Sequence, residues 1–124
     1  MTSVDLKTPT PAARISIWVL RVLMGGLFLF AAAMKLTGQP AMVAEFDTVG
    51  LGQWFRYLTG LLELAGGVLV LIPRRSVLGA GILLTVDLGA FVAQVAVLHM
   101  DWIHTVVIGA LLVALIVIQR RHPA

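Results

Sequence analysis

Residues 58–72 read Leu-Thr-Gly-Leu-Leu-Glu-Leu-Ala-Gly-Gly-Val-Leu-Val-Leu-Ile, and this stretch decides the fold. It is apolar enough to lie in a bilayer, yet it carries the ionisable Glu63 among glycines. On a helix, Gly60, Gly66 and Gly67 lie three or four residues from Glu63, on a face where another backbone can approach closely. A carboxylate there needs a protein partner or a proton, so other helices must surround it.

The composition around this stretch is that of a membrane protein. The 124 residues leave room for one domain, and 60% of them are hydrophobic while 12% are charged. Soluble domains contain roughly 45–50% and 25% of these classes. The net charge is +3, but the basic residues flank apolar runs, which suits anionic lipid headgroups and argues against nucleic acid as a partner. The absence of cysteine excludes disulfides and thiol chemistry within this chain.

The apolar segments predict an all-α polytopic membrane protein, a bundle of four transmembrane helices. We expect helices over about residues 15–36, 55–72, 77–98 and 103–118, in a domain over 14–121 that follows a flexible cytoplasmic tail, residues 1–13. Pro40 predicts a short interfacial helix through Phe46. The link over residues 73–76 is so short that the helices on either side of it should be antiparallel neighbours.

Charge asymmetry predicts the orientation. Four crossings put both termini on one side, and the positive-inside rule makes that side cytoplasmic, in a bacterial plasma membrane. The basic residues of that side are Lys7, Arg14, Arg74, Arg75, Arg120 and Arg121, against Lys35 and Arg56 on the other. A cleaved signal peptide is the competing interpretation of the first segment, with residues 22–30 as its apolar core and residues 31–33 as a small-residue cleavage site.

Polar residues at membrane depth form the candidate site. We expect Arg21, Glu63 and Asp87 to meet in the bundle core, together with Gln94, which follows Asp87 by seven residues on the same helix face. One guanidinium facing two carboxylates leaves one negative charge over, so in a low dielectric one acid should keep a proton. Such a cluster either fixes helix register or forms a proton or ligand pocket.

Four further residues mark the outer margin of this site: Lys35, His99, Asp101 and His104. Lys35 should extend to the headgroups, as lysines at helix ends commonly do. The two histidines and the aspartate suggest a metal site or a proton port, but they lack the spacing of a defined metal motif, so no metal site is predicted.

Small residues on the third helix predict a packing face. Gly81, Thr85 and Gly89 form a stripe nearly opposite Asp87, and such stripes let helix backbones approach closely. We expect this stripe to meet another helix of this chain or of a second subunit.

Two segments resemble the DoxX and DoxX-like small membrane proteins. They are Arg21-Val-Leu-Met-Gly-Gly-Leu-Phe-Leu-Phe-Ala-Ala-Ala-Met-Lys35 and Gly60-Leu-Leu-Glu63-Leu-Ala-Gly-Gly. Members of that family are similar in size, have four predicted crossings, and place an arginine and a lysine on helix 1 and a glutamate before a glycine pair on helix 2. The resemblance covers about residues 14–119. It implies an association with a thiosulfate:quinone oxidoreductase or with membrane complexes that handle oxidative stress, and distant relatives resemble assembly factors or cargo receptors.

Together these features predict a small subunit or accessory protein of a membrane complex, embedded in the bilayer as a homo-oligomer or beside other membrane subunits. One alternative is a quinone-reactive oxidoreductase subunit in which Glu63 or Asp87 exchanges protons. Another is a small-molecule or proton transporter that acts as an oligomer. The sequence has no dinucleotide fingerprint, haem-attachment motif or phosphate loop, which argues against an autonomous enzyme; quinone is the cofactor that the resemblance suggests.

Overall fold

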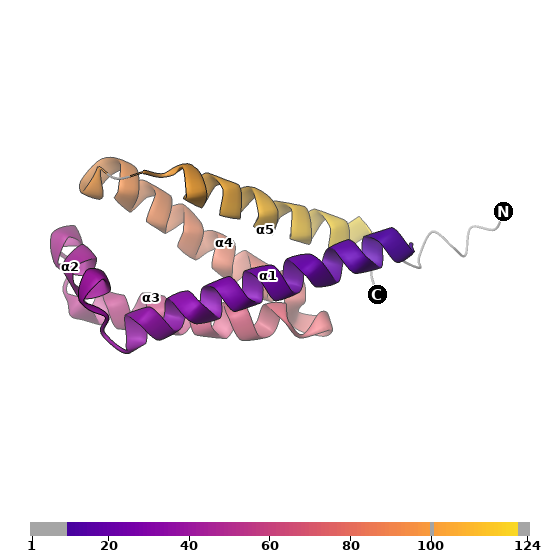
Figure 1. Ribbon diagram of the computed structural model, residues 1–124, viewed down its shortest axis with the longest axis horizontal. Coiled ribbons are helices and arrows are strands. Elements are labelled where there is room, and N and C mark those ends of the chain that lie inside the picture. The colour runs from indigo at the N-terminus through magenta and orange to yellow at the C-terminus, as the bar shows by residue number, and fades with distance from the viewer. Residues whose placement is uncertain (1–9, 100, 122–124) are drawn as a thin grey trace.

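The computed structural model describes residues 10–99 and 101–121, and every regular element within them is a helix. Four long helices run lengthwise, and a short one lies across one end (Figure 1). The long helices are α1 (Pro11–Leu36), α3 (Gln53–Val70), α4 (Ser76–Ala93) and α5 (Ile103–Arg121), and the short one is α2 (Pro40–Val49). The 3₁₀ turn η2 (Pro73–Arg75) joins α3 to α4, and the π-helical turn η3 (Gln94–Leu98) extends α4.

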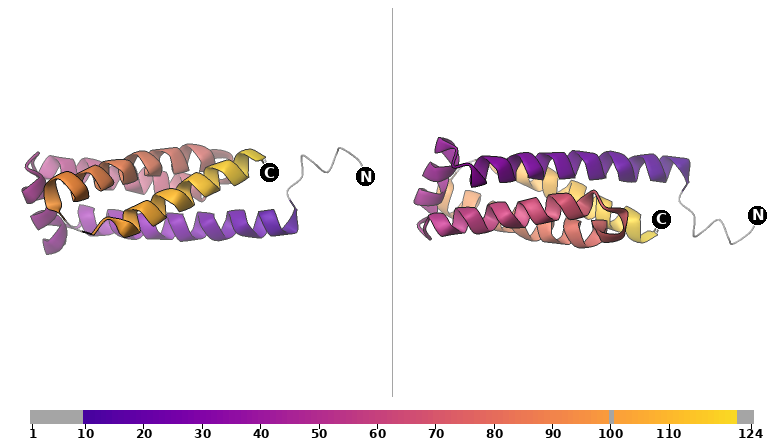
Figure 2. Two further views of the ribbon diagram at one scale, coloured as in Figure 1. Left: turned by 90° about the horizontal axis from the view of Figure 1, so that it is seen from above. Right: turned by 90° about the horizontal axis from the view of Figure 1, so that it is seen from below.

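The long helices form a ring in which each packs against two others. Helix α1 contacts α3 and α5, and α4 contacts the same two helices. The start of α1 and the end of α5 lie at one end of the molecule, and α2 lies at the opposite end (Figures 1 and 2). We call these the terminal end and the α2 end. As predicted, the tight turn at residues 73–76 makes its two helices antiparallel neighbours.

Three helical segments are long and apolar enough to cross a membrane: Pro11–Leu36, Pro73–Leu98 and Ile103–Arg121. Large apolar side chains also cover the outside of the molecule, such as Phe30 at 66% exposed and Val92 at 61%. This surface suits a lipid environment rather than water. Helix α3 is less apolar because it carries Arg56 and Glu63, so a fourth crossing stays a prediction.

The helix boundaries differ from the expected ones where capping groups act. Helix α1 begins four residues earlier than expected, because the Thr10 hydroxyl accepts a hydrogen bond from the Ala13 amide at 3.0 Å and Pro11 occupies the first helical position. Residues 11–13 of the predicted tail are therefore helical, and residues 1–9 lie outside the described part of the chain. Helix α2 begins at Pro40 as predicted but continues beyond the expected end at Phe46 to Val49, where Gly50 caps it with a φ of 84° that suits glycine.

Close backbone contacts fill the terminal half of the bundle. A Cβ atom on Gly79 of α4 would lie 2.5 Å from the Val70 nitrogen and 2.8 Å from the Gly66 oxygen, so α3 and α4 nearly touch there. Beside this contact lies an apolar core that includes the fully buried Met24 and Leu83. This half of the molecule is a packed core.

The predicted packing of the Gly81, Thr85 and Gly89 stripe against another helix of this chain is wrong. A Cβ atom on Gly81 or Gly89 would have no other atom of the described chain within 4 Å, and Thr85 is exposed. Helix α4 makes its close approach through Gly79 instead, on another face. Contact of the stripe with a second subunit stays a prediction.

Candidate functional site

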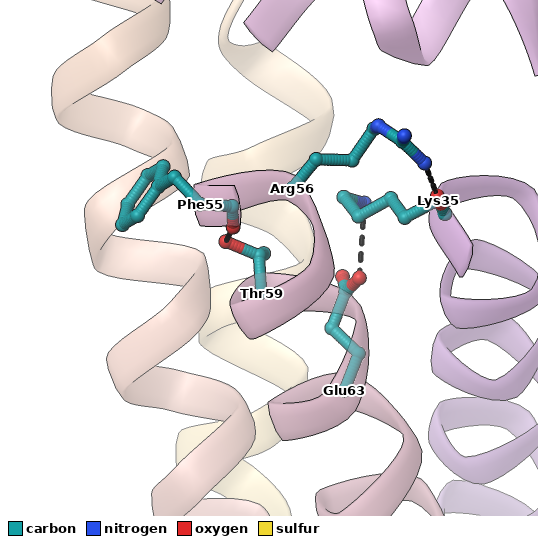
Figure 3. Close-up of polar contacts among 5 residues, drawn as sticks. All are labelled: Lys35, Phe55, Arg56, Thr59 and Glu63. Atoms are coloured by element: carbon teal, nitrogen blue, oxygen red, sulfur yellow. Dashed lines mark hydrogen bonds and ion pairs between the residues drawn. The ribbon is translucent and has the colours of Figure 1, made fainter. Parts of the chain in front are cut away.

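A buried ion pair joins α1 to α3 (Figure 3). The Lys35 ammonium lies 3.0 Å from Glu63 Oε1, with the two side chains 15% and 5% exposed. Apart from this ammonium, Glu63 Oε1 has no hydrogen-bond donor within the described residues. Gly60 lets the helices meet, because a Cβ atom there would lie 3.3 Å from the Lys35 Cβ and 3.0 Å from the Leu36 side chain. The expectation that Lys35 extends to the headgroups is therefore wrong.

Arg56 holds the backbone beside this pair (Figure 3). Its Nη1 donates a hydrogen bond to the Lys35 carbonyl oxygen, and its Nε donates to Gln53 Oε1 at 2.7 Å. Its guanidinium also stacks over the Tyr57 ring at 4.3 Å. The carbonyl groups at a helix C-terminus lack intrahelical donors, so Arg56 stabilises the end of α1 and positions Lys35 toward Glu63.

A second polar group lies between the end of α4 and the start of α5. Gln94 is buried, accepts a hydrogen bond from the Thr105 hydroxyl and lies 3.4 Å from His104, measured between their Nε2 atoms. Asp87 is buried two turns earlier on α4, against Gly109, where a Cβ atom would lie only 2.7 Å from the carboxylate Oδ2. Gly109 therefore makes room for the Asp87 carboxylate.

A third polar group surrounds Arg21 near the terminal end. Its Nη2 and Nε donate hydrogen bonds to Gln119 Oε1 at 2.6 and 3.1 Å, and Nε also lies 3.3 Å from the Ser76 hydroxyl. The guanidinium packs 4.8 Å from the centre of the Trp18 ring. Within the described residues Arg21 forms no salt bridge.

The predicted meeting of Arg21, Glu63 and Asp87 is therefore wrong, although all three side chains and Gln94 are buried. The reason is helix register. Gly60 faces Lys35 and Gly67 faces Leu29, so the antiparallel pair α1 and α3 places Glu63 level with about residue 32. Arg21 lies about eleven residues away along α1, which at 1.5 Å per residue is roughly 16 Å and beyond the reach of its side chain.

The outer residues have separate positions. His99 closes the π-helical turn in the left-handed conformation, with φ of 51°. Asp101 accepts a hydrogen bond from the Ile103 amide at 3.0 Å, at the start of α5. His104 is exposed. Of the four outer-margin residues, His104 and Lys35 border a cavity. These placements separate His99 and Asp101 from the Lys35–Glu63 pair.

A cavity of about 520 Å³ lies at the α2 end, beside the ion pair. It borders Lys35 and Glu63 on one side and Gln94 and His104 on another, and apolar side chains form most of its wall. Thr85 and Gly89 line it and are exposed, so the cavity opens to the outside along α4. Its remaining lining residues are Met42, Glu45, Phe46, Val49, Phe55, Leu58, Thr59, Leu62, Val86, Ala90, Ala93 and Leu98.

Sequence reasoning missed three contributors to these polar groups. Arg56 reads as a loop cation and Gln119 as a helix boundary, but both are buried and bonded to other helices. Ser76 reads as a turn residue, yet it is fully buried and donates to the Val70 carbonyl at 2.8 Å. The sequence carries no signal for the contacts of these three residues with α1, because each contact joins residues of different helices that are far apart in the chain.

Comparison with known protein families identifies the family of this chain. The model described as the DoxX-like family matches residues 19–118, which covers most of the chain. The chain therefore belongs to the DoxX-like family. No curated protein and no solved structure matches it.

Proposed function

For this member of the DoxX-like family, we propose a role in binding an amphipathic molecule within the membrane, in the cavity beside Lys35 and Glu63. The molecule has a small polar head with hydrogen-bond acceptors and an apolar tail, and quinones are the class that fits best. The observation that carries the proposal is the cavity itself: apolar walls, a buried ion pair at one side, and an opening along α4. Ligand sites of about 300–1,000 Å³ with few convergent polar groups are typical of small-molecule binding.

The head of such a molecule would be held by Lys35 and by the Gln94 and His104 pair. The Lys35 ammonium has three N–H groups and uses one toward Glu63, so it has donors to spare for a carbonyl oxygen. Gln94 and His104 border the same cavity and supply a second polar position. The wall therefore offers two polar positions, and a quinone has two carbonyl groups that could use them. Phe46 and Phe55 line the apolar part, where a ring can pack.

The tail would leave the cavity toward lipid. Thr85 and Gly89 are both exposed and both line the cavity, so the opening faces the side of the bundle rather than its end. The packed core of the terminal half supports binding rather than passage through a single chain, because its side chains leave the bundle closed beyond Leu83.

The binding is tested by titrating the purified protein with a short-chain quinone and following its tryptophan fluorescence, since Trp54 makes an edge-to-face contact with Phe55 of the cavity wall. The key variant is Lys35→Met combined with Glu63→Leu, because replacing a whole buried ion pair by apolar residues is often neutral for stability. A hydrogen bond to a charged group contributes about 1.5–3 kcal/mol. We expect affinity to fall about tenfold to a hundredfold.

The control is Thr59→Val, which removes a hydroxyl that bonds the Phe55 carbonyl of its own helix while keeping the cavity volume. It should leave affinity nearly unchanged. A folded double variant that binds the quinone as tightly as the original protein would contradict the proposed head site.

The proposed setting is a four-span protein with both termini in the cytoplasm of a bacterium, acting as a small accessory subunit beside a redox enzyme or as a homo-oligomer. The fourth crossing is supported by the place of α3 in the ring, between α1 and α4. Its charged Arg56 and Glu63 are buried, while Leu61 and Val68 are exposed at 55% and 44%, as in a helix that faces lipid. The accessory role is supported by the absence of a cofactor motif in the sequence.

A further inference from the structure

The terminal end holds a buried cation whose described partners are all neutral. Arg21 is 4% exposed and donates to Gln119 Oε1 and to the Ser76 hydroxyl. Burying an ion costs several kcal/mol unless an opposite charge compensates it. Within residues 10–99 and 101–121, no carboxylate forms a salt bridge with this guanidinium. The arrangement therefore lacks a negative charge.

The acceptors beside Arg21 are neutral, and one buried donor next to them has no partner among the described residues. Gln119 gives its Oε1 to Arg21, and its Nε2 is buried without an acceptor in the described residues, while the residue is 7% exposed. Ser76 gives its hydroxyl hydrogen to the Val70 carbonyl. A group with several acceptor oxygens and a negative charge would satisfy both Arg21 and Gln119.

Charge collects at the same end. Arg74 and Arg75 directly precede Ser76, Arg120 and Arg121 directly follow Gln119, and all four are exposed. The acidic residues of the described part lie elsewhere, in α2, in the middle of α3 and α4, or just before α5. Arginines that flank membrane helices lie at the level of the lipid phosphates.

We propose that Arg21 and Gln119 bind a phosphate group at the terminal end. Planar guanidinium groups match phosphate oxygens in pairs, and an amide N–H adds a third donor. The phosphate belongs to an anionic phospholipid headgroup or to a soluble phosphate anion. This site lies at the opposite end from the cavity and does not depend on the quinone proposal.

The test compares thermal unfolding in micelles of dodecyl maltoside, which has no phosphate, with unfolding in the same micelles after adding phosphatidylglycerol or inorganic phosphate. Two variants lower the net charge by the same amount. Gln119→Glu places a carboxylate where Oε1 already lies 2.6 Å from Arg21 Nη2, whereas Arg120→Gln removes an exposed charge next to it. The original protein should gain a few degrees from phosphatidylglycerol or from phosphate, and the effective additive identifies the source.

In dodecyl maltoside alone, Gln119→Glu should be more stable than the original protein, because its carboxylate supplies the missing negative charge. Adding phosphatidylglycerol or phosphate should then not raise its melting temperature, whereas Arg120→Gln should keep most of the rise seen for the original protein. Equal losses in the two variants would mean general attraction to a basic surface and would overturn the proposal. Native mass spectrometry gives a second readout: the original protein should retain one phosphatidylglycerol or phosphate per chain, and retention of neither would also overturn it.

Asp5 lies outside the described residues, so Asp5→Asn is measured alongside. This variant should behave as the original protein does. A lower melting temperature in dodecyl maltoside alone would assign the counter-charge to Asp5 and would overturn the proposal.

Discussion

Lys35 and Glu63 form an ion pair inside a largely apolar bundle, and both residues line the cavity. Arg56 orders the last turn of α1 and so limits where the ammonium can go. The cavity wall also carries Glu45, so its lining has one lysine and two carboxylates. The Lys35 ammonium is therefore the cationic donor of the wall, and it can donate to an electron-rich head such as the carbonyl oxygen of a quinone.

A double-mutant cycle should reveal the ion pair. Removing one partner of a buried pair costs about 3–5 kcal/mol, because the other charge stays buried alone. We expect Lys35→Ala to lower the free energy of unfolding by an amount near this range, because it leaves Glu63 alone at 5% exposed. Glu63→Ala should cost less, because the remaining Lys35 is 15% exposed, and the double variant should cost less than the sum. The measurement is unfolding in mixed detergent and dodecyl sulfate micelles.

The matching control for this cycle is Arg21→Ala combined with Glu63→Ala. These residues belong to separate polar groups, so their effects should add. Additive effects for Lys35 with Glu63, or strong coupling of Arg21 with Glu63, would show that the pairing described above is wrong.

The partner of Glu63 could not be chosen from the sequence. The position of Glu63 among glycines shows that its carboxylate needs a partner. It does not show which one, because Arg21 and Lys35 lie fourteen residues apart on one helix. At about 100° per residue, both project within roughly 40° of the same face. Only the register between α1 and α3 separates them, and register depends on side-chain packing at Gly60 and Gly67, which no single segment encodes.

At the scale of elements, the glycines of α4 have opposite roles. Gly79 lies against the α3 backbone, whereas a Cβ atom on Gly81 would have no neighbour within 4 Å. The sequence predicted close packing at Gly81, Thr85 and Gly89 because these small residues recur every four positions. Small residues predict close approach only where a second helix is present, and the ring of contacts in this chain leaves that face of α4 open.

Alanine substitution should separate these glycines. Gly79→Ala forces the α3 and α4 backbones apart, because its Cβ would lie 2.5 Å from a backbone nitrogen, and overpacking of this kind typically costs about 1–3 kcal/mol. Gly81→Ala adds a methyl group in open space and improves helix propensity, so it should be neutral or stabilising by up to about 1 kcal/mol. Thermal unfolding in detergent measures both, and equal effects would contradict the α3–α4 contact.

At the scale of the whole molecule, the number of crossings decides where the cavity lies in the membrane. The chain has no cysteine, so single-cysteine variants report cleanly. With four crossings, cysteines at Ser3 and Arg74 should both be protected from an impermeant thiol reagent in intact cells, and one at Asp47 should react. If α3 does not cross, the cysteine at Arg74 should react as the one at Asp47 does.

The all-helical fold, the helix positions to within a few residues and the membrane composition could all be predicted, because hydrophobic runs and proline caps act locally. The cavity could not be predicted from the sequence. It exists because α2 and the π-helical turn at Gln94 hold the helix ends apart at one end, while Gly79 draws α3 and α4 together at the other. Such spacing between distant segments is a property of the assembled bundle.

Two leucine substitutions on one stripe of α4 test whether the cavity opening admits an amphipathic ligand. Gly89→Leu fills the opening, whereas Gly81→Leu adds the same side chain outside the cavity, and neither Cβ has a neighbour within 4 Å. The measurement is the amount of quinone extracted per mole of protein purified from membranes in mild detergent. We predict a full complement for Gly81→Leu and little or none for Gly89→Leu, and equal amounts in the two variants would contradict the account.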